Sequence, residues 1–241
     1  KTPFMDVIAA AAKVKAEDIL AHDLTLYSRV PAAIWGEERE FISSPKLDDL
    51  QCAFACFRGF TQGQKEKYIS VYALFDNEEV GSATSQGAGS TFLANTLERL
   101  ARSLGYSYDE TMAMIARSFM ISADNAHSVH PNHPEYADPV NRPVMNGGIV
   151  IKYSAAQKYA TNAFSAAYFK KLCKDHDIPT QTFTNHSDNP GGSTLGNISN
   201  TVIAMPTVDI GLPQLAMHSS YETAGVKDTA YLVDAVTKFY E

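Results

Sequence analysis

Apolar and polar residues form blocks of two kinds along the chain, and these blocks predict helices that alternate with strands. Apolar residues spaced three or four positions apart predict helices over residues 47–60, 90–104 and 226–240. Helix-forming composition predicts another over the alanine-rich residues 4–13, and further helices are expected over residues 108–119 and 162–176, with a short one from about residue 193. Short apolar runs predict strands over residues 68–75, 120–123, 148–153, 181–185 and 202–205, and the alternation of polar and apolar residues over 23–28 predicts an antiparallel or edge strand. The alternation of helices and strands favours an α/β fold, with a mixed, mostly parallel sheet that carries helices on both faces.

The composition is that of a globular protein. The chain has 241 residues, 45% of them hydrophobic and 20% charged, which suits one large α/β domain or two smaller ones. A net charge of −7 and a pI near 5.5 offer no attraction for nucleic acid or for an anionic membrane, so we expect neither as a partner. No apolar run reaches the length of a transmembrane helix.

The cysteines indicate a reducing compartment. There are three of them, so they cannot all pair within the chain. Cys52 and Cys56 lie four residues apart in an apolar helical pattern, which is typical of thiols buried in a core. We therefore expect a cytoplasmic location.

An acidic cluster follows the apolar run 68–75. Asp76, Glu78 and Glu79 come directly after that run, at what would be the carboxyl end of a parallel strand, where open α/β sheets bind their ligands. Two adjacent carboxylates repel each other, so they require a cation, a shared proton or open solvent. A metal site is the most specific of these interpretations. In such a site, one carboxylate binds the metal and the other accepts a proton from water. A solvated acidic turn remains the alternative.

Further candidate ligands lie at other predicted element ends. Asp124 ends the strand 120–123, and His127, His130 and His133 follow within ten residues, although their spacing matches no zinc-finger pattern. A loop in which Asp124 caps a turn and the histidines are solvated explains these residues equally well.

Three more side chains have both a structural and a functional interpretation. Asp48 and its neighbour Asp49 open a predicted helix, where the helix dipole alone favours them. His218 is an isolated histidine, a type that is more often partly buried than a ligand. Lys152 lies in an apolar strand, where a lysine either needs a partner or extends its amine to solvent.

Five segments, in this order, resemble the aspartyl aminopeptidase family, whose members are dinuclear zinc exopeptidases related to aminopeptidase I. The segments are residues 44–50 (Ser-Pro-Lys-Leu-Asp-Asp-Leu), 75–82 (Phe-Asp-Asn-Glu-Glu-Val-Gly-Ser), 122–127 (Ser-Ala-Asp-Asn-Ala-His), 185–188 (Asn-His-Ser-Asp) and 214–219 (Gln-Leu-Ala-Met-His-Ser). The resemblance extends over nearly the whole chain, and the set of motifs is highly specific.

The resemblance implies a role for each acidic candidate. Asp48 would bridge two zinc ions, Glu79 and His218 would bind one of them, and Asp124 would bind the other. Glu78 would be the general base that activates water and returns its proton to the leaving amine. The substrates would be peptides that lose their N-terminal residue.

The resemblance also implies a preference for N-terminal Asp or Glu. By motif position, Lys152 is the candidate that would meet the substrate carboxylate, with His127 and His130 lining the pocket. A neutral, leucine-type aminopeptidase of the same family is the alternative.

The sequence departs from the family pattern in two respects. No His-x-Asp motif, which supplies another zinc ligand in the family, occurs near the start of this chain. Family members are nearly twice as long, with a dimerisation domain inserted into the catalytic domain, and assemble as dodecamers. Residues 1–241 therefore resemble the major part of one catalytic domain, without the N-terminal segment and the inserted domain. An inactive catalytic-domain fragment with a metal-binding or assembly role is the further alternative.

Overall fold

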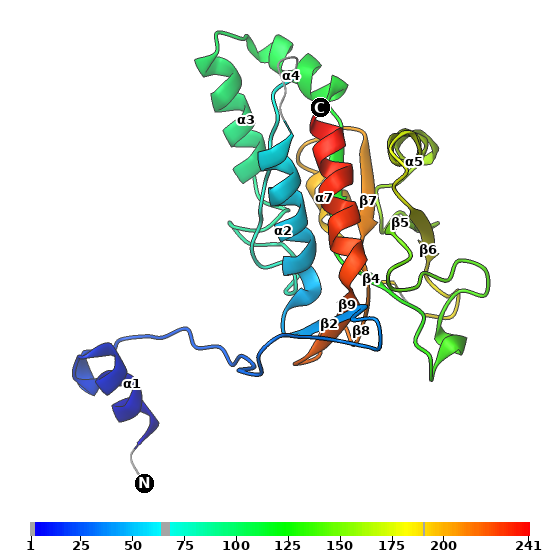
Figure 1. The fold of residues 1–241 in the computed structure, drawn as a ribbon. Helices are drawn as coiled ribbons and strands as arrows, with labels where there is room; N and C mark the ends of the chain where they lie inside the picture. Colours follow the sequence, from blue (N-terminus) through cyan, green and yellow to red (C-terminus); the bar gives the residue numbers. More distant parts are fainter. Residues whose placement is uncertain (1–2, 64–67, 190) are drawn as a thin grey trace.

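Two small sheets organise the structure, a computed structural model that describes residues 3–63, 68–189 and 191–241 (Figure 1). The four-stranded sheet has the order β3 (Met120–Ala123), β7 (Thr207–Gly211), β5 (Ile149–Tyr153), β6 (Thr180–Thr184). Its β3–β7 and β5–β6 pairs are parallel, and its β5–β7 pair is antiparallel. The five-stranded sheet has the order β1 (Ala33–Trp35), β2 (Phe41–Ser44), β9 (Glu222–Gly225), β8 (Pro213–Leu215), β4 (Ala126–His127), and only its β4–β8 pair is parallel.

The helices occupy most of the predicted positions. They are α1 (Phe4–Ala12), α2 (Leu47–Gln62), α3 (Phe92–Ser103), α4 (Tyr108–Arg117), α5 (Ala163–Asp175), α6 (Leu195–Ser199) and α7 (Val226–Tyr240), with 3-10 turns η1 (Ala16–Asp18) and η2 (Pro134–Tyr136). Capping boxes begin two of them, because Ser107 and Asn162 each accept a hydrogen bond from the backbone three residues ahead. None of the helices in the described part of the chain is long and apolar enough to cross a membrane.

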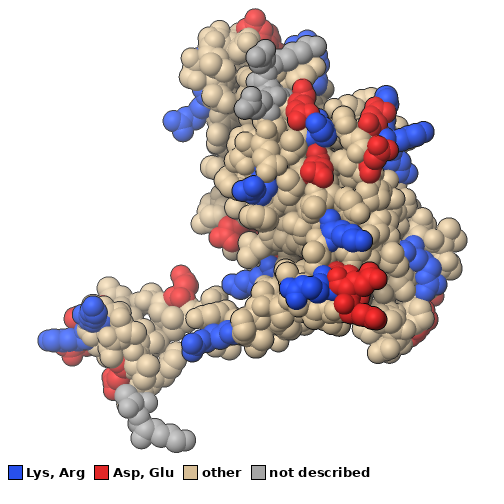
Figure 2. Space-filling view, in the orientation of Figure 1, with Lys and Arg blue, Asp and Glu red and all other residues tan. Residues whose placement is uncertain are grey.

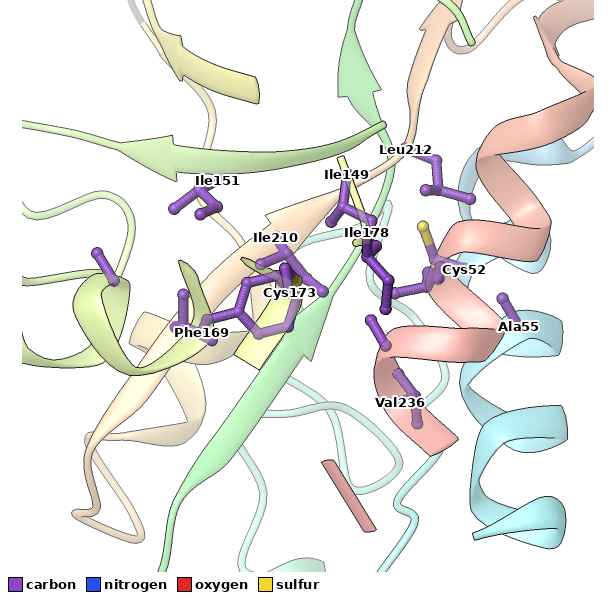
Figure 3. Close-up of a cluster of buried hydrophobic side chains, with 14 of the residues drawn as sticks. Cys52, Ala55, Ile149, Ile151, Phe169, Cys173, Ile178, Ile210, Leu212 and Val236 are labelled. Carbon is purple, nitrogen blue, oxygen red and sulfur yellow. The ribbon is translucent and has the colours of Figure 1, made fainter. Parts of the chain in front are cut away.

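The main core lies between the four-stranded sheet and three long helices. The sheet contributes Ile149 and Ile151 of β5, and Val208 and Ile210 of β7, to this core. These side chains face α2, α5 and α7, and Phe169 of α5 packs among them (Figure 3). Successive strand residues point to opposite faces, so Val150 belongs to a second cluster with Ala126, Tyr159 and Phe183. The short helix α6 contacts β3 and β7.

Helices α2 and α7 lie side by side over one face of the sheet (Figure 1). Their contact needs small residues, because a Cβ at Gly59 would lie 2.6 Å from the Cβ of Val236. With this face turned towards α7, the apolar residues Leu50, Phe54 and Phe57 of α2 are left exposed.

The α/β class, the mixed sheet and helices on both faces are confirmed. The sequence does not reveal the second sheet, since its strands are only two to four residues long. Lys and Arg side chains are scattered over the face shown in Figure 2 and form no single basic patch there.

Three predicted strands are wrong. Residues 68–75 are extended but pair with no strand among the described residues; Ile69 and Leu74 are exposed, and Tyr72 instead donates a hydrogen bond to Ala53 O of α2 (3.0 Å). Residues 23–28 lie in an extended segment that leads from α1 to the body of the molecule and has no partner strand there (Figure 1). Residues 202–205 close the end of α6, because the N–H groups of Val202 and Ile203 donate to Ser199 O, and the strand begins only at Thr207.

The chain passes from one sheet to the other at two points. It leaves β3 and enters β4 through Asp124 and Asn125, and it leaves β7 and enters β8 at Leu212. Asp124 N donates to Ile210 O, and Ala126 N donates to Leu212 O, so the two crossings run side by side. Asp124 therefore lies at the junction of the sheets.

A buried carboxylate joins α7 to the loop before β5. Asp228 is fully buried, and its two oxygens accept hydrogen bonds from Asn146 N (2.6 Å) and Gly148 N (2.9 Å). Burial raises the pKa of Asp228 from 3.8 to about 6, against the opposing effect of these two hydrogen bonds.

We expect Asp228 to make stability depend on pH. Because its folded pKa lies above the ordinary value, its contribution to the unfolding free energy is fully present below pH 3.8 and is lost as the pH rises through about 6. The unfolding free energy of the wild type minus that of Asp228→Asn should therefore fall by about 1.4 kcal/mol between pH 5 and pH 8. Urea unfolding of both proteins at the two pH values measures it, and an unchanged difference would contradict the assignment.

Candidate metal centre

Three side chains with metal-binding atoms meet at the junction of the two sheets. They are Asp48 at the start of α2, Glu79 in the turn after residues 68–75, and His218 in the loop between β8 and β9. His218 Nε2 lies 3.1 Å from Asp48 Oδ2 and 3.1 Å from Glu79 Oε2. One such atom from each residue lies within 4.8 Å of the others. The structure thus brings together three of the four residues that the sequence analysis names as metal ligands.

The fourth, Asp124, lies against this group. Its Oδ2 is 3.1 Å from Lys152 Nζ, and Lys152 also donates to Asn125 O (2.6 Å). Lys152 is only 3% exposed. Burial lowers the pKa of Lys152, but the charge of Asp124 and its hydrogen bond, together with the charges of Tyr159 and Asp209, outweigh burial, and the pKa lies above its ordinary value. Lys152 is therefore a buried cation held beside a candidate ligand.

Burial and crowded negative charge together raise the pKa values of three carboxylates at the site. Burial, and then the charge of Asp124 and a hydrogen bond with its carboxylate, raise the pKa of Asp48 to about 9. Burial, followed by the charges of Asp124 and Glu79, raises the pKa of Asp49 to about 6. Burial and the same neighbouring charges raise the pKa of Glu78 to about 7. All three pKa values are raised, which is the direction expected for buried carboxylates that lack a neighbouring cation.

The side chains fit a zinc ion. Asp48 Oδ1 is buried and has no hydrogen-bond partner among the described residues, a costly state that a cation relieves. Two carboxylates and an imidazole are a ligand set that zinc accepts. Ligand atoms about 2.0–2.1 Å from a tetrahedral zinc are roughly 3.3 Å apart, close to the 3.1 Å that separates His218 Nε2 from each carboxylate.

A tight turn presents the adjacent residues Glu78 and Glu79. Asn77 has a positive φ of 60°, Gly81 N donates to Glu78 O (2.8 Å), and Ser82 N donates to Asn77 O (2.9 Å). Neighbouring side chains on a straight strand point in opposite directions, whereas a turn allows both to face one group. Asp76 Oδ1 accepts Asn77 N–H (2.8 Å), so Asp76 supports the turn.

The two predicted pocket histidines differ in their surroundings. His127, in β4, is exposed, and partial desolvation followed by the positive charges of Lys152 and His218 lowers its pKa. His130 is exposed in the next loop, where its Nδ1 accepts Asn132 N–H (3.2 Å) and its ring lies 5.4 Å from that of His133. The structure therefore places His127 beside the cluster, and the contacts of His130 lie within its own loop. Their role in substrate binding stays a prediction, as does that of Lys152.

Sequence reasoning missed two groups that shape the site. Glu222 is buried in β9 and accepts the backbone N–H of both Asp48 (2.9 Å) and His218 (2.8 Å). Asn125 donates to the side chains of Gln51 (2.9 Å) and Gln214 (2.8 Å) behind Asp124. In the sequence, Glu222 is marked only by being an acidic residue four positions after His218. Nothing in the sequence distinguishes the buried amide Asn125 from an exposed one.

Comparison with known proteins adds the family. The family model described as "Aminopeptidase I zinc metalloprotease (M18)" matches residues 1–240. A "Probable M18 family aminopeptidase 2" of Clostridium novyi is 45% identical over 236 residues, which cover 98% of this chain and 54% of that protein. A "Probable aspartyl aminopeptidase" of Ricinus communis is 35% identical over 98% of this chain and 50% of its own length. The chain thus spans about half the length of these relatives.

A solved structure agrees in fold. The mApe1 dodecamer of S. cerevisiae superposes with a TM-score of 0.82 at 27% identity, over 98% of this chain and 54% of the yeast chain. Together with the family match over residues 1–240, these likenesses show that the chain belongs to the aminopeptidase I zinc metalloprotease (M18) family.

Proposed function

We propose that this chain forms most of the active site of a zinc aminopeptidase that removes the N-terminal residue of peptides. The observation that carries the proposal is the meeting of Asp48, Glu79 and His218 around a buried carboxylate oxygen that has no protein partner. Membership of a zinc metalloprotease family supports the choice of zinc.

The proposed roles follow the geometry. Asp48, Glu79 and His218 would hold one zinc ion. Asp48 and Asp124 would hold a second ion; the effect of the Asp124 carboxylate on the pKa of Asp48 supports this pairing, because it shows that the two side chains lie close together. Zinc, when bound, supplies Lewis acidity that polarises the substrate carbonyl and acidifies water.

Glu78 would act as the general base. It lies next to the candidate ligand Glu79 and faces the same charges, while no ion pair and no side-chain hydrogen bond engages its carboxylate among the described residues. Its carboxylate would take a proton from the attacking water as the water oxygen bonds to the peptide carbon. The same proton would pass to the amine nitrogen when the C–N bond breaks.

An acidic N-terminal residue is the proposed preference. Lys152 provides a positive charge at the site, and burial makes an ionic contact there stronger than at the surface. The name of the Ricinus communis relative, "Probable aspartyl aminopeptidase", supports the same preference. A neutral preference remains the second candidate, favoured by the fact that Lys152 Nζ is already in contact with Asp124 and Asn125 O.

We further propose that the chain works as part of a larger, oligomeric protein in the cytoplasm. Apolar residues are exposed along α2 and in residues 68–75, where they include Phe54, Phe57 and Leu74. Relatives about twice as long contain enough chain to cover such a surface. This supports the reading of residues 1–241 as the major part of one catalytic domain, and the dodecamer of the yeast neighbour supports a homo-oligomer.

We expect the purified chain to bind zinc through His218. His218→Ala removes one of three converging ligands, so zinc affinity should fall by more than the roughly 10–100-fold typical of losing a group that only orients a ligand. Competition with a chromophoric chelator measures the affinity. His176→Ala, at the exposed C-terminal end of α5, is the matched control and should bind zinc like the wild type. Equal affinity in the His218 variant would refute the site.

Glu78→Gln should bind zinc normally and lose turnover. Removing a general base costs about 10²–10⁴-fold in kcat. The loss is measured with the full-length protein, as the rate at which it releases N-terminal aspartate from an aspartyl amide. Glu98→Gln, in α3, where the carboxylate pairs with Arg102 (2.7 Å), serves as the control. Undiminished turnover would show that another group accepts the proton.

Lys152→Met tests the preference. If the amine meets the substrate carboxylate, the ratio of kcat/KM for aspartyl over leucyl amides should fall by about 10–100-fold, the range expected for a hydrogen bond between charged groups. Zinc content must be measured alongside, because Lys152 also contacts Asp124. Lys158→Met, in the exposed loop after β5, is the control. An unchanged ratio with zinc retained would favour the neutral aminopeptidase.

A further inference from the structure

Glu222 is a buried carboxylate that joins two of the metal-binding segments. It is 2% exposed and begins β9, where it lies opposite Ser44 of β2. Its Oε2 accepts Asp48 N–H at 2.9 Å, and its Oε1 accepts His218 N–H at 2.8 Å. Among the described residues, no lysine, arginine or histidine forms an ion pair with it. Both of its oxygens are thus committed to the backbone of two candidate ligands.

The chemistry of this arrangement requires a carboxylate. An ionised Glu has two acceptor oxygens and no donor, so one side chain can accept both N–H groups. A Gln of the same shape has a single acceptor oxygen, and its amide nitrogen would meet the other N–H donor-to-donor. An Asp is one methylene shorter. Glu is therefore suited to this position in a way that its closest substitutes are not.

The two segments that Glu222 joins have unusual backbone conformations. His218 and Ala216 have φ values of 66° and 58°, and Lys46, just before Asp48, has a φ of 59°. Residues other than glycine keep such left-handed conformations only where the surroundings hold them. Asp48 itself has non-helical angles (φ −79°, ψ 117°) at the start of α2, where its N–H has no partner within the helix. The bonds to Glu222 supply the missing restraint.

We infer that Glu222 is a positioning residue of the metal centre: its carboxylate holds the backbone of Asp48 and His218 in the arrangement that zinc binds. This inference rests on the proposed function. Metal sites need their ligands held to within about 0.5 Å, and groups that orient a ligand typically account for 10–100-fold in metal affinity. Through the backbone, Glu222 fixes the 3.1 Å approach of Asp48 Oδ2 to His218 Nε2.

The test compares Glu222→Gln with Thr223→Val. Thr223 is the next residue in β9 and hydrogen-bonds Ser43 Oγ (2.7 Å), so its variant removes a hydrogen bond at the same place without touching Asp48 or His218. Three quantities are measured on both: zinc affinity by chelator competition, the visible absorption spectrum of the cobalt-loaded protein, and thermal unfolding of the metal-free protein. Glu222→Gln should lose roughly 10–100-fold in zinc affinity and change the cobalt spectrum, and Thr223→Val should do neither.

Two outcomes would overturn the inference. In the first, Glu222→Gln lowers the midpoint of thermal unfolding but leaves the zinc affinity and the cobalt spectrum unchanged, as expected of a residue that only joins β2 to β9. In the second, amide hydrogen exchange of the metal-free protein at Asp48 and His218 is as slow in Glu222→Gln as in the wild type. A wild-type chain that binds no zinc would instead refute the proposed function, and the exchange measurement would still decide whether Glu222 holds the two segments.

Discussion

Mutual repulsion among buried carboxylates is the constraint on which the junction of the two sheets depends. The carboxylates of Asp124 and Glu79 act on both Asp48 and Glu78 and, together with burial, raise the pKa of each. Desolvation makes such repulsion much stronger than it is at the surface. Proteins keep charges of one sign together only where a cation or a proton compensates them. The buried amine of Lys152 compensates part of this charge, and the orphaned oxygen of Asp48 marks where more is needed.

The fold supplies this crowding through its topology. The chain crosses from the four-stranded sheet to the five-stranded sheet twice, from β3 to β4 and from β7 to β8, and these two connections run side by side. Asp124 lies in the connection from β3 to β4, and His218 lies in the loop that follows β8. Strand β2 ends beside β9 and leads directly into Asp48. Binding and catalytic residues are concentrated in such connections, which a rigid scaffold of strands and helices positions.

The rigid and exposed parts of the molecule have different relations to the site. The core between α2, α5, α7 and the four-stranded sheet is continuous and excludes water. The opposite side of α2 and the extended residues 68–75 expose apolar side chains instead, and the turn with Glu78 and Glu79 follows that exposed segment. Asp48 and Asp124 are thus attached to elements of the main core. Glu78 and Glu79 instead follow residues 68–75, whose exposed apolar surface we propose contacts other parts of a larger protein.

The sequence by itself determined the elements whose information is local. Helical periodicity located α2, α5 and α7, and apolar runs located β3, β5 and β6, because these patterns depend on neighbouring residues. Motif order also identified the family and the ligand candidates. Only the tertiary structure decided that residues 68–75 pair with no strand, since strand formation depends on a partner distant in the chain. It alone brought Glu222 to Asp48 and His218, because a buried hydrogen bond between distant segments leaves no periodic trace in the sequence.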